Sequence, residues 1–122
     1  MADAAEHVLA TCHCGSVSVR LPQAPAEITH CNCSLCRRYG VLWAYYEIAE
    51  VVIASASATE TYAWNGKNVD FHRCAGCGCV THWYPRKSTR HTLGINARLL
   101  DPKIIAAAEI RYKDDAGTGL FQ

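Results

Sequence analysis

The chain has 122 residues, enough for one domain and too few for two of ordinary size. Half of its residues are hydrophobic and 19% are charged, which indicates a folded globular protein and excludes an intrinsically disordered one. The formal net charge of +1 and the lack of a Lys/Arg-rich run argue against nucleic-acid binding. No apolar run approaches the ~20 residues that a membrane-spanning helix needs.

The N-terminal segment carries Asp3 and Glu6, where a secretory signal would have a basic start and an apolar core. We therefore expect a cytoplasmic protein, in which thiols stay reduced. In that setting the eight cysteines favour metal binding over the two alternatives, disulfides and thiol redox chemistry. The sequence leaves the oligomeric state open.

Short β-type runs dominate the chain. Residues 15–21 alternate, with Val17, Val19 and Leu21 on one face. Residues 41–48 are aromatic and β-branched, and alternation places Trp43 on the same face of that strand as Tyr45. Further strands are expected over 51–54, 60–64, 69–73, 79–84, 91–96 and 110–113, with a hairpin turn at Asn65-Gly66.

Helical content is expected to be small. One helical turn is predicted over 33–39 and another over 97–100, whereas 102–108 suits either helix or strand. Residues 114–122, which include two glycines, are expected to form a loose tail. The elements together predict a mostly β fold: a small, antiparallel, zinc-stapled single domain over 1–122.

One candidate metal centre contains four cysteines. Two of them, Cys12 and Cys14, are expected to face the same side of an extended segment. The other two are Cys74 and Cys77, where neighbouring glycines permit a tight turn and backbone N–H groups can hydrogen-bond the thiolates. Together they would form a closed zinc site. Because structural zinc contributes ~10–16 kcal/mol in small zinc-binding peptides, we expect the metal-free protein to be unfolded or molten.

A second candidate centre consists of Cys31, Cys33 and Cys36. Three local thiolates can hold one zinc ion and leave a fourth position for water or a substrate thiol, as catalytic zinc sites do. A set of soft thiolates suits the binding of another thiol better than it suits hydrolysis. Alternatively, a further side chain closes this centre as a second structural site. The residues that could close it are Cys79, His30 and His82.

Three residues near the second cluster are candidates for substrate binding. Arg37 and Arg38 either hold the carboxylates of a glutathione-like thiol or form a solvated basic turn. Tyr45 either walls a pocket and supplies a phenol as a proton donor or packs in the core. The histidines expected in strands could shuttle a proton or serve as hydrogen-bonded structural side chains. These histidines are His72, His82 and His91.

The three cysteine clusters, in this order, resemble the glutathione-dependent formaldehyde-activating enzyme family, which also includes centromere protein V. The resemblance covers about residues 8–101. The matching segments are Cys12-His13-Cys14-Gly15, Cys31-Asn32-Cys33-Ser34-Leu35-Cys36, Cys74-Ala75-Gly76-Cys77-Gly78, and the N-x-R-x-L element within Ile95–Asp101. Cys79 departs from the family's pattern.

The resemblance implies a β-tent fold with two zinc ions as cofactors. The family's structural ligands match Cys12, Cys14, Cys74 and Cys77. Its catalytic ligands match Cys31, Cys33 and Cys36. The implied activity is that of a carbon–sulfur lyase, which condenses formaldehyde with glutathione to S-hydroxymethylglutathione and catalyses the reverse cleavage. The implied partners are a small thiol such as glutathione and a small aldehyde.

The predicted function is therefore a zinc-dependent carbon–sulfur lyase-type reaction between a thiol and formaldehyde or a similar aldehyde. The alternative is a non-catalytic module, in which two structural zinc ions support the binding of a ligand or a partner protein. A zinc ribbon that binds nucleic acid is the third possibility, and the near-neutral charge disfavours it.

Overall fold

The computed structural model describes residues 7–54, 58–64 and 68–117, which fold mainly into short strands. One sheet contains β1 (Val8–Thr11), β2 (Ser18–Leu21) and β5 (Val52–Ala54). The second sheet contains, from edge to edge, β10 (Glu109–Lys113), β3 (Glu27–Cys31), β4 (Trp43–Glu47), β9 (Thr92–Asn96), β8 (Val80–Pro85), β7 (Val69–Cys74) and β6 (Thr59–Tyr62). The prediction of a small, mostly β single domain is confirmed.

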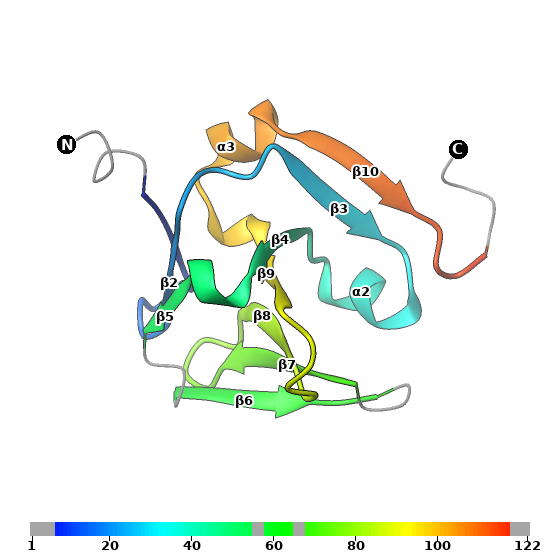
Figure 1. Ribbon diagram of the computed structural model, residues 1–122, viewed down its shortest axis with the longest axis horizontal. Coiled ribbons are helices and arrows are strands. Elements are labelled where there is room, and N and C mark those ends of the chain that lie inside the picture. Colours follow the sequence, from blue (N-terminus) through cyan, green and yellow to red (C-terminus); the bar gives the residue numbers. More distant parts are fainter. Residues whose placement is uncertain (1–6, 55–57, 65–67, 118–122) are drawn as a thin grey trace.

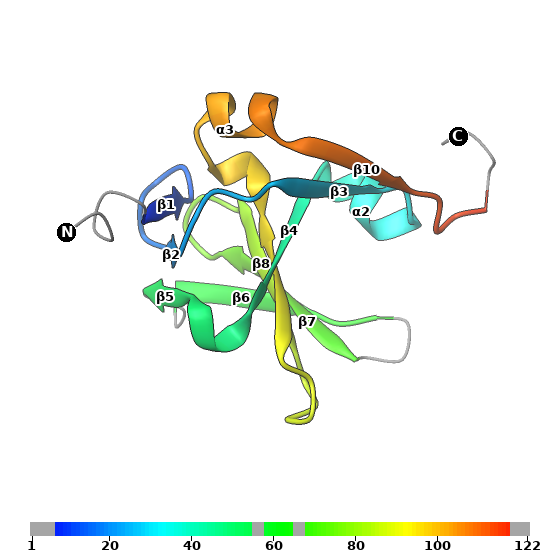
Figure 2. The ribbon, with the colours of Figure 1, turned by 45° about the horizontal axis from the view of Figure 1, so that its top comes forward.

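The second sheet is antiparallel except at one edge, where β10 runs parallel to β3 from Glu109 opposite Glu27 to Lys113 opposite Cys31. Figure 1 shows the two ends of this sheet, β10 with β3 and β7 with β6, on opposite sides of the molecule. The short helix α2 (Ser34–Tyr39) lies between them, and the turned view in Figure 2 shows the same arrangement.

Helix α2 begins and ends at residues that its sequence marks clearly. The sulfur of its N-cap residue, Cys33, accepts a hydrogen bond from the N–H of Cys36 at 3.2 Å. The helix ends at Gly40, whose φ of +69° is a conformation that glycine adopts at little cost. The expected helical turn over 33–39 is confirmed, and the N-cap hydrogen bond holds the sulfur of Cys33 close to Cys36.

The remaining helical segments are η1 (Ile48–Glu50), η3 (Ala97–Leu99) and α3 (Pro102–Ala107). The segment that suited either helix or strand is helical because Asp101 caps its first turn by accepting from the N–H of Lys103. Pro102 occupies the first turn, where a backbone N–H has no partner within the helix and its absence costs nothing. In the described ranges, no helix has both the length and the apolar character that crossing a membrane requires.

The larger hydrophobic core draws buried side chains from strands of both sheets. Val19 and Leu21 of β2, Ile28 of β3 and Ile95 of β9 are all fully buried. The buried face predicted from the alternation over 15–21 is therefore confirmed, although β2 itself begins only at Ser18. A core of this kind holds both sheets in place and leaves their ends free to carry the cysteines.

Two strands were missing from the sequence prediction, which assigned none to β1 or β3. Both are short: β1 is only four residues long, and β3 interrupts its apolar positions with Thr29 and His30. The predicted Asn65-Gly66 turn lies outside the described residues, and β6 and β7 on either side of it pair antiparallel.

Candidate metal centres and active site

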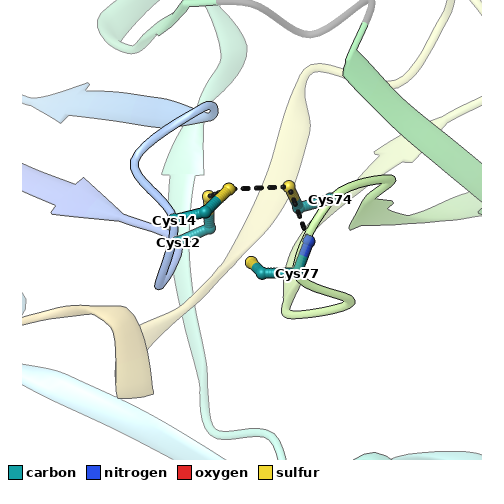
Figure 3. A group of neighbouring side chains, drawn as sticks. All are labelled: Cys12, Cys14, Cys74 and Cys77. Atoms are coloured by element: carbon teal, nitrogen blue, oxygen red, sulfur yellow. Dashed lines mark hydrogen bonds between the residues drawn. The ribbon is translucent and has the colours of Figure 1, made fainter.

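Four cysteines from two distant turns come together at the end of the first sheet. Figure 3 shows the side chains of Cys12 and Cys14 facing those of Cys74 and Cys77 across a small gap. All four sulfurs lie within 4.8 Å of one another. The Cys12–Cys14 and Cys14–Cys74 sulfur separations are 3.8 and 3.6 Å, close to the ~3.8 Å between thiolates around a tetrahedral ion with bonds of ~2.3 Å. The group can hold a metal ion.

Two tight turns produce this convergence. Cys12 and Cys14 do not meet as neighbours on one strand face, since β1 ends at Thr11 and the chain then turns back through Gly15, at a φ of +83°. The turn is closed by the N–H of Gly15, which donates to the carbonyl of Cys12 at 3.1 Å. The β7–β8 turn is closed similarly by Gly78, whose N–H donates to the carbonyl of Cys74 at 2.9 Å.

Backbone N–H groups surround these sulfurs, as they do in zinc knuckles. The N–H of Val17 donates to the sulfur of Cys12 at 3.3 Å, and the N–H of Gly76 donates to that of Cys74 at 3.3 Å. Backbone N–H groups of Cys79 and Cys14 hold the pKa of the Cys77 thiol at about 5, well below its ordinary value. Donors of this kind stabilise the thiolate form that binds a metal.

The second cluster lies where β3 runs into α2. Cys31 is the last residue of β3, Cys33 is the N-cap of α2 and Cys36 lies within the helix. Their three sulfurs also lie within 4.8 Å of one another. Among the described residues, no fourth histidine, cysteine or acidic side chain lies within 4.8 Å of all three sulfurs, so the cluster presents three ligands for a metal.

Burial and hydrogen bonds give the three thiols different acidities. Burial raises the pKa of Cys36 to about 11, although the indole N–H of Trp43 donates to this sulfur at 3.3 Å and opposes the rise. Burial also raises the pKa of Cys31. Burial is also the largest single influence on Cys33, but several hydrogen bonds, the N–H of Cys36 foremost among them, together outweigh it and lower the pKa of this thiol. Bound metal would be needed to hold all three as thiolates near neutral pH.

A cavity of about 670 Å³ opens over the second cluster, and all three of its sulfur-bearing residues line it. This volume lies within the range of small-molecule sites. The walls are largely aromatic, and two cations, Arg90 and Lys113, also line the cavity. The residues of the aromatic wall are Trp43, Tyr45, Trp64, Phe71 and Trp83.

The segment after β10 lies against the second cluster. The carboxylate of Asp115 accepts from the thiol of Cys31 at 2.9 Å. Asn32 holds this segment with both ends of its side chain: it donates to the carboxylate of Asp114 at 2.7 Å and accepts from the N–H of Ala116 at 3.0 Å. Residues 114–116 of the tail that the sequence predicted to be loose are therefore attached to the site.

The predicted substrate-binding residues lie at different distances from the aromatic cavity. Tyr45 lines it, and its ring lies 6.1 Å from that of Trp83. Arg37 lines a separate cavity of about 400 Å³ that also reaches Cys31 and Cys36. Arg38 is exposed and donates to the carbonyl of Ser34 in its own helix at 2.9 Å.

None of the residues that could have closed the second centre joins it. Cys79 packs with the four-cysteine group instead. His82 is buried on the opposite face of β8 from Trp83, where its ring stacks on that of His72 with centroids 4.3 Å apart. His30 packs its ring against Tyr112, 5.5 Å away. Among the described residues the three-sulfur group is therefore closed by none of these predicted candidates, and the carboxylate of Asp115 is hydrogen-bonded to one of its thiols, that of Cys31.

Several residues of this site were missed in the sequence. Phe71 and Trp83 had a usable signal, because they pair directly across β7 and β8 and share one face of that hairpin. Arg90 and Asp115 had none, since each lies in a loop whose path no local pattern reveals.

A family model described as "Glutathione-dependent formaldehyde-activating enzyme" matches residues 7–114. The chain belongs to this family. A crystal structure of a Rhodobacter sphaeroides protein, a structural genomics target, shares the fold with a TM-score of 0.68 and 24% sequence identity, and the match covers 84% of this chain and 99% of that one. No protein in the curated comparison set matches significantly.

Membership of the glutathione-dependent formaldehyde-activating enzyme family fits the geometry described above. The family match spans both cysteine groups and every residue of the aromatic wall. It ends at Asp114, so Asp115 and Ala116 lie beyond it. The resemblance predicted from the order of the cysteine clusters is confirmed.

Proposed function

We propose that the protein is a zinc-dependent carbon–sulfur lyase-type enzyme that adds a small thiol to formaldehyde or a similar aldehyde and cleaves the product in reverse. The observation that carries this proposal is the three-cysteine cluster at the base of a small-molecule cavity, in a chain of the glutathione-dependent formaldehyde-activating enzyme family. Glutathione is the first candidate for the thiol, because the family's name states that dependence.

The two cysteine groups support different roles. The closed set of Cys12, Cys14, Cys74 and Cys77 would hold a structural zinc ion, since its four sulfurs leave no place for a substrate. The set of Cys31, Cys33 and Cys36 would hold a catalytic zinc ion, which supplies a soft electrophilic position where a thiol binds as thiolate. Both donor sets fit zinc by ligand type and spacing.

The side chains around the second cluster would orient the thiol and retain its ligands. The indole N–H of Trp43 and the N–H of Cys36 each donate to a cluster sulfur, which fixes the direction of that sulfur and reduces its negative charge. The aromatic wall limits access of water to one side of the cluster. Arg90 and Lys113 line the same cavity and would pair with the carboxylates of the thiol, whereas Arg37 lines the separate cavity that also reaches Cys31 and Cys36.

The reaction needs a new S–C bond and a proton on oxygen. The sulfur of the thiol attacks the carbonyl carbon, the π electrons of the C=O bond move to oxygen, and the proton lost by the thiol ends on that oxygen. Tyr45 lines the cavity, and burial raises the pKa of its phenol, so its O–H is available to hydrogen-bond the developing alkoxide. Much of any acceleration would come from holding the two reactants together.

The exchange rate between glutathione, formaldehyde and their adduct tests this proposal. Zinc-loaded protein at micromolar concentration should raise the rate measured by NMR, and Cys33→Ser should abolish the increase by removing a ligand of the open centre. Cys79→Ser is the matched control, because Cys79 lies outside both ligand sets and its loss should leave the rate unchanged. Absence of acceleration by the natural chain would show that glutathione and formaldehyde are not its substrates.

A further inference from the structure

The tryptophans of this chain are concentrated at the cavity over the second cluster. The sequence contains three tryptophans, and Trp43, Trp64 and Trp83 all line this one cavity. The larger hydrophobic core is built from aliphatic side chains and Tyr46. Trp43, Phe71 and Trp83 instead pack in a smaller cluster that includes Cys31 and Cys36, where they also line the cavity. Large aromatic side chains usually contribute most to a core, so their position beside the cysteines of the cavity points to its ligand as well.

The aromatic wall is a connected surface. The ring of Trp83 lies 6.1 Å from that of Tyr45, and the ring of Trp43 lies 6.1 Å from that of Phe71. These separations are in the range of favourable ring contacts. The guanidinium of Arg90, which lines the same cavity, lies 5.8 Å from the centre of the Trp83 ring, as a cation stacked on an aromatic face.

The backbone leaves room for this wall at Gly94 of β9. A Cβ atom at that position would lie 2.1 Å from Nε1 of Trp83, far closer than two such atoms can approach. Only glycine accommodates the indole there, so the ring lies directly against the strand. The wall also begins at the cluster itself, since the indole N–H of Trp43 donates to the sulfur of Cys36 at 3.3 Å.

Glutathione matches only part of this surface. Its carboxylates could pair with Arg90 and Lys113, which line the cavity, but it has no flat apolar group to place against the aromatic wall. A thiol with an aromatic or other flat apolar substituent would place its sulfur at the cluster and its ring against Phe71 and Trp83, which are partly exposed. Ring–ring contacts of this kind are favourable and give the orientation of the ligand.

We propose that the preferred thiol of this protein carries an aromatic or similarly flat apolar group, which the tryptophan-lined cavity binds beside the three-cysteine cluster. This inference rests on the proposed function, since it requires that a thiol binds at that cluster. It changes the substrate class from a polar peptide thiol to an aryl-substituted one.

Equilibrium binding of three thiols tests the inference. Phenylethanethiol and mercaptoethanol share the same two-carbon thiol end and differ in the ring, and glutathione is the third ligand. Cobalt-substituted protein reports sulfur binding through its charge-transfer absorption, and tryptophan fluorescence reports the cavity, because all three tryptophans line it. We expect phenylethanethiol to bind at least about tenfold more tightly than either of the other two.

Two variants on the same strand locate the effect. Trp83→Leu should reduce the advantage of phenylethanethiol by roughly three- to tenfold. Tyr84→Leu is the matched control: its side chain is on the opposite face of β8 and does not line this cavity, so the advantage should persist. If Trp83→Leu does not fold, the affinities of the three thiols for the natural chain still test whether an aromatic thiol is preferred.

The outcomes separate the two proposals. If no thiol alters the cobalt spectrum, thiol binding at the cluster is wrong and the proposed function fails. If glutathione changes the spectrum and binds as tightly as phenylethanethiol, the proposed function stands and the aromatic preference is overturned. Equal loss of affinity for all three thiols in Trp83→Leu would likewise overturn it, since the residue would then support the cluster and not the ring.

Discussion

At the scale of single residues, His82 shows how the fold treats an ionisable group that the chemistry does not use. Its side chain is 1% exposed and hydrogen-bonded to the hydroxyl of Thr81 at 2.8 Å. Burial, with the neighbouring ring of His72, lowers its pKa from 6.5 to about 3. The reading of His82 as a structural histidine therefore fits the structure better than a role as proton shuttle.

This burial predicts a loss of stability in mild acid. As the pH falls below 6.5, His82 becomes protonated in the unfolded chain, whereas in the folded chain it stays neutral until about pH 3. The free energy of unfolding therefore falls as the pH falls through that window. The slope from one such group is at most ~1.4 kcal/mol per pH unit. In urea unfolding of metal-loaded protein at pH 7 and pH 5, His82→Gln should show a smaller loss than the natural chain.

Comparison at the same pH removes the acid-induced metal release that both proteins share. His91→Gln is the control: His91 is exposed, so this variant should lose as much stability between pH 7 and pH 5 as the natural chain does. Equal losses in all three proteins would show that His82 titrates normally in the folded state.

At the scale of elements, the path of β10 brings the C-terminal segment to the site. The parallel register places Lys113 opposite Cys31, so the residues that follow must pass the second cluster. Asn32 then holds them: its backbone N–H donates to the carbonyl of Lys113 at 3.2 Å, and its side chain bonds Asp114 and Ala116. Asn32, the residue after β3, thus attaches a segment about eighty residues further along the chain.

Removing that attachment should free the segment without unfolding the domain. In Asn32→Ala, the two side-chain hydrogen bonds are lost and the backbone bond remains, so the Ala116 amide should exchange with deuterium at least about tenfold faster. Exchange at amides within β3 and β4 should be unchanged. Asn68→Ala, at an exposed position on the far wall of the cavity, should leave the Ala116 rate as it is. Unchanged protection of Ala116 in Asn32→Ala would show that other contacts hold the segment.

At the scale of the whole molecule, the four-cysteine group connects two sheets. It joins the β1–β2 turn of one sheet to the β7–β8 turn of the other, across a sequence separation of 60 residues between Cys14 and Cys74. Closing so long a loop restricts the unfolded chain strongly. Zinc binding of ~10–16 kcal/mol in small peptides is comparable to the ~5–15 kcal/mol that stabilises a typical domain.

Loss of this metal should therefore unfold the protein, whereas loss of the other should not. Cys77→Ser should give a molten or unfolded chain, with near-UV circular dichroism abolished and no cooperative thermal transition. Cys33→Ser should keep a cooperative transition, because its cluster lies within six residues and closes no long loop. A thermal transition that survives thorough metal removal from the natural chain would contradict the structural role of the four-cysteine group.

The sequence predicted those parts of the fold and site that depend on local pattern. The spacing of the cysteines identified both groups. The alternation over this strand placed Trp43 and Tyr45 on one face and Tyr46 on the other, although it left open which face, if either, lines a pocket. The sequence did not reveal that β10 would pair with β3, because such pairing depends on contacts between residues far apart in the chain. For the same reason Asp115 and Arg90 could not be placed at the site.

The order of synthesis gives the β10–β3 pairing a kinetic consequence. Strand β10 is the partner of a strand made about eighty residues earlier, so the outer side of β3 lacks this neighbour until β10 has left the ribosome. The Cys31–Cys36 motif emerges early and can capture an ion before that strand arrives. Nascent chains stalled before residue 109 should thus already retain metal there, while still presenting an unpaired backbone edge on which chaperones can act.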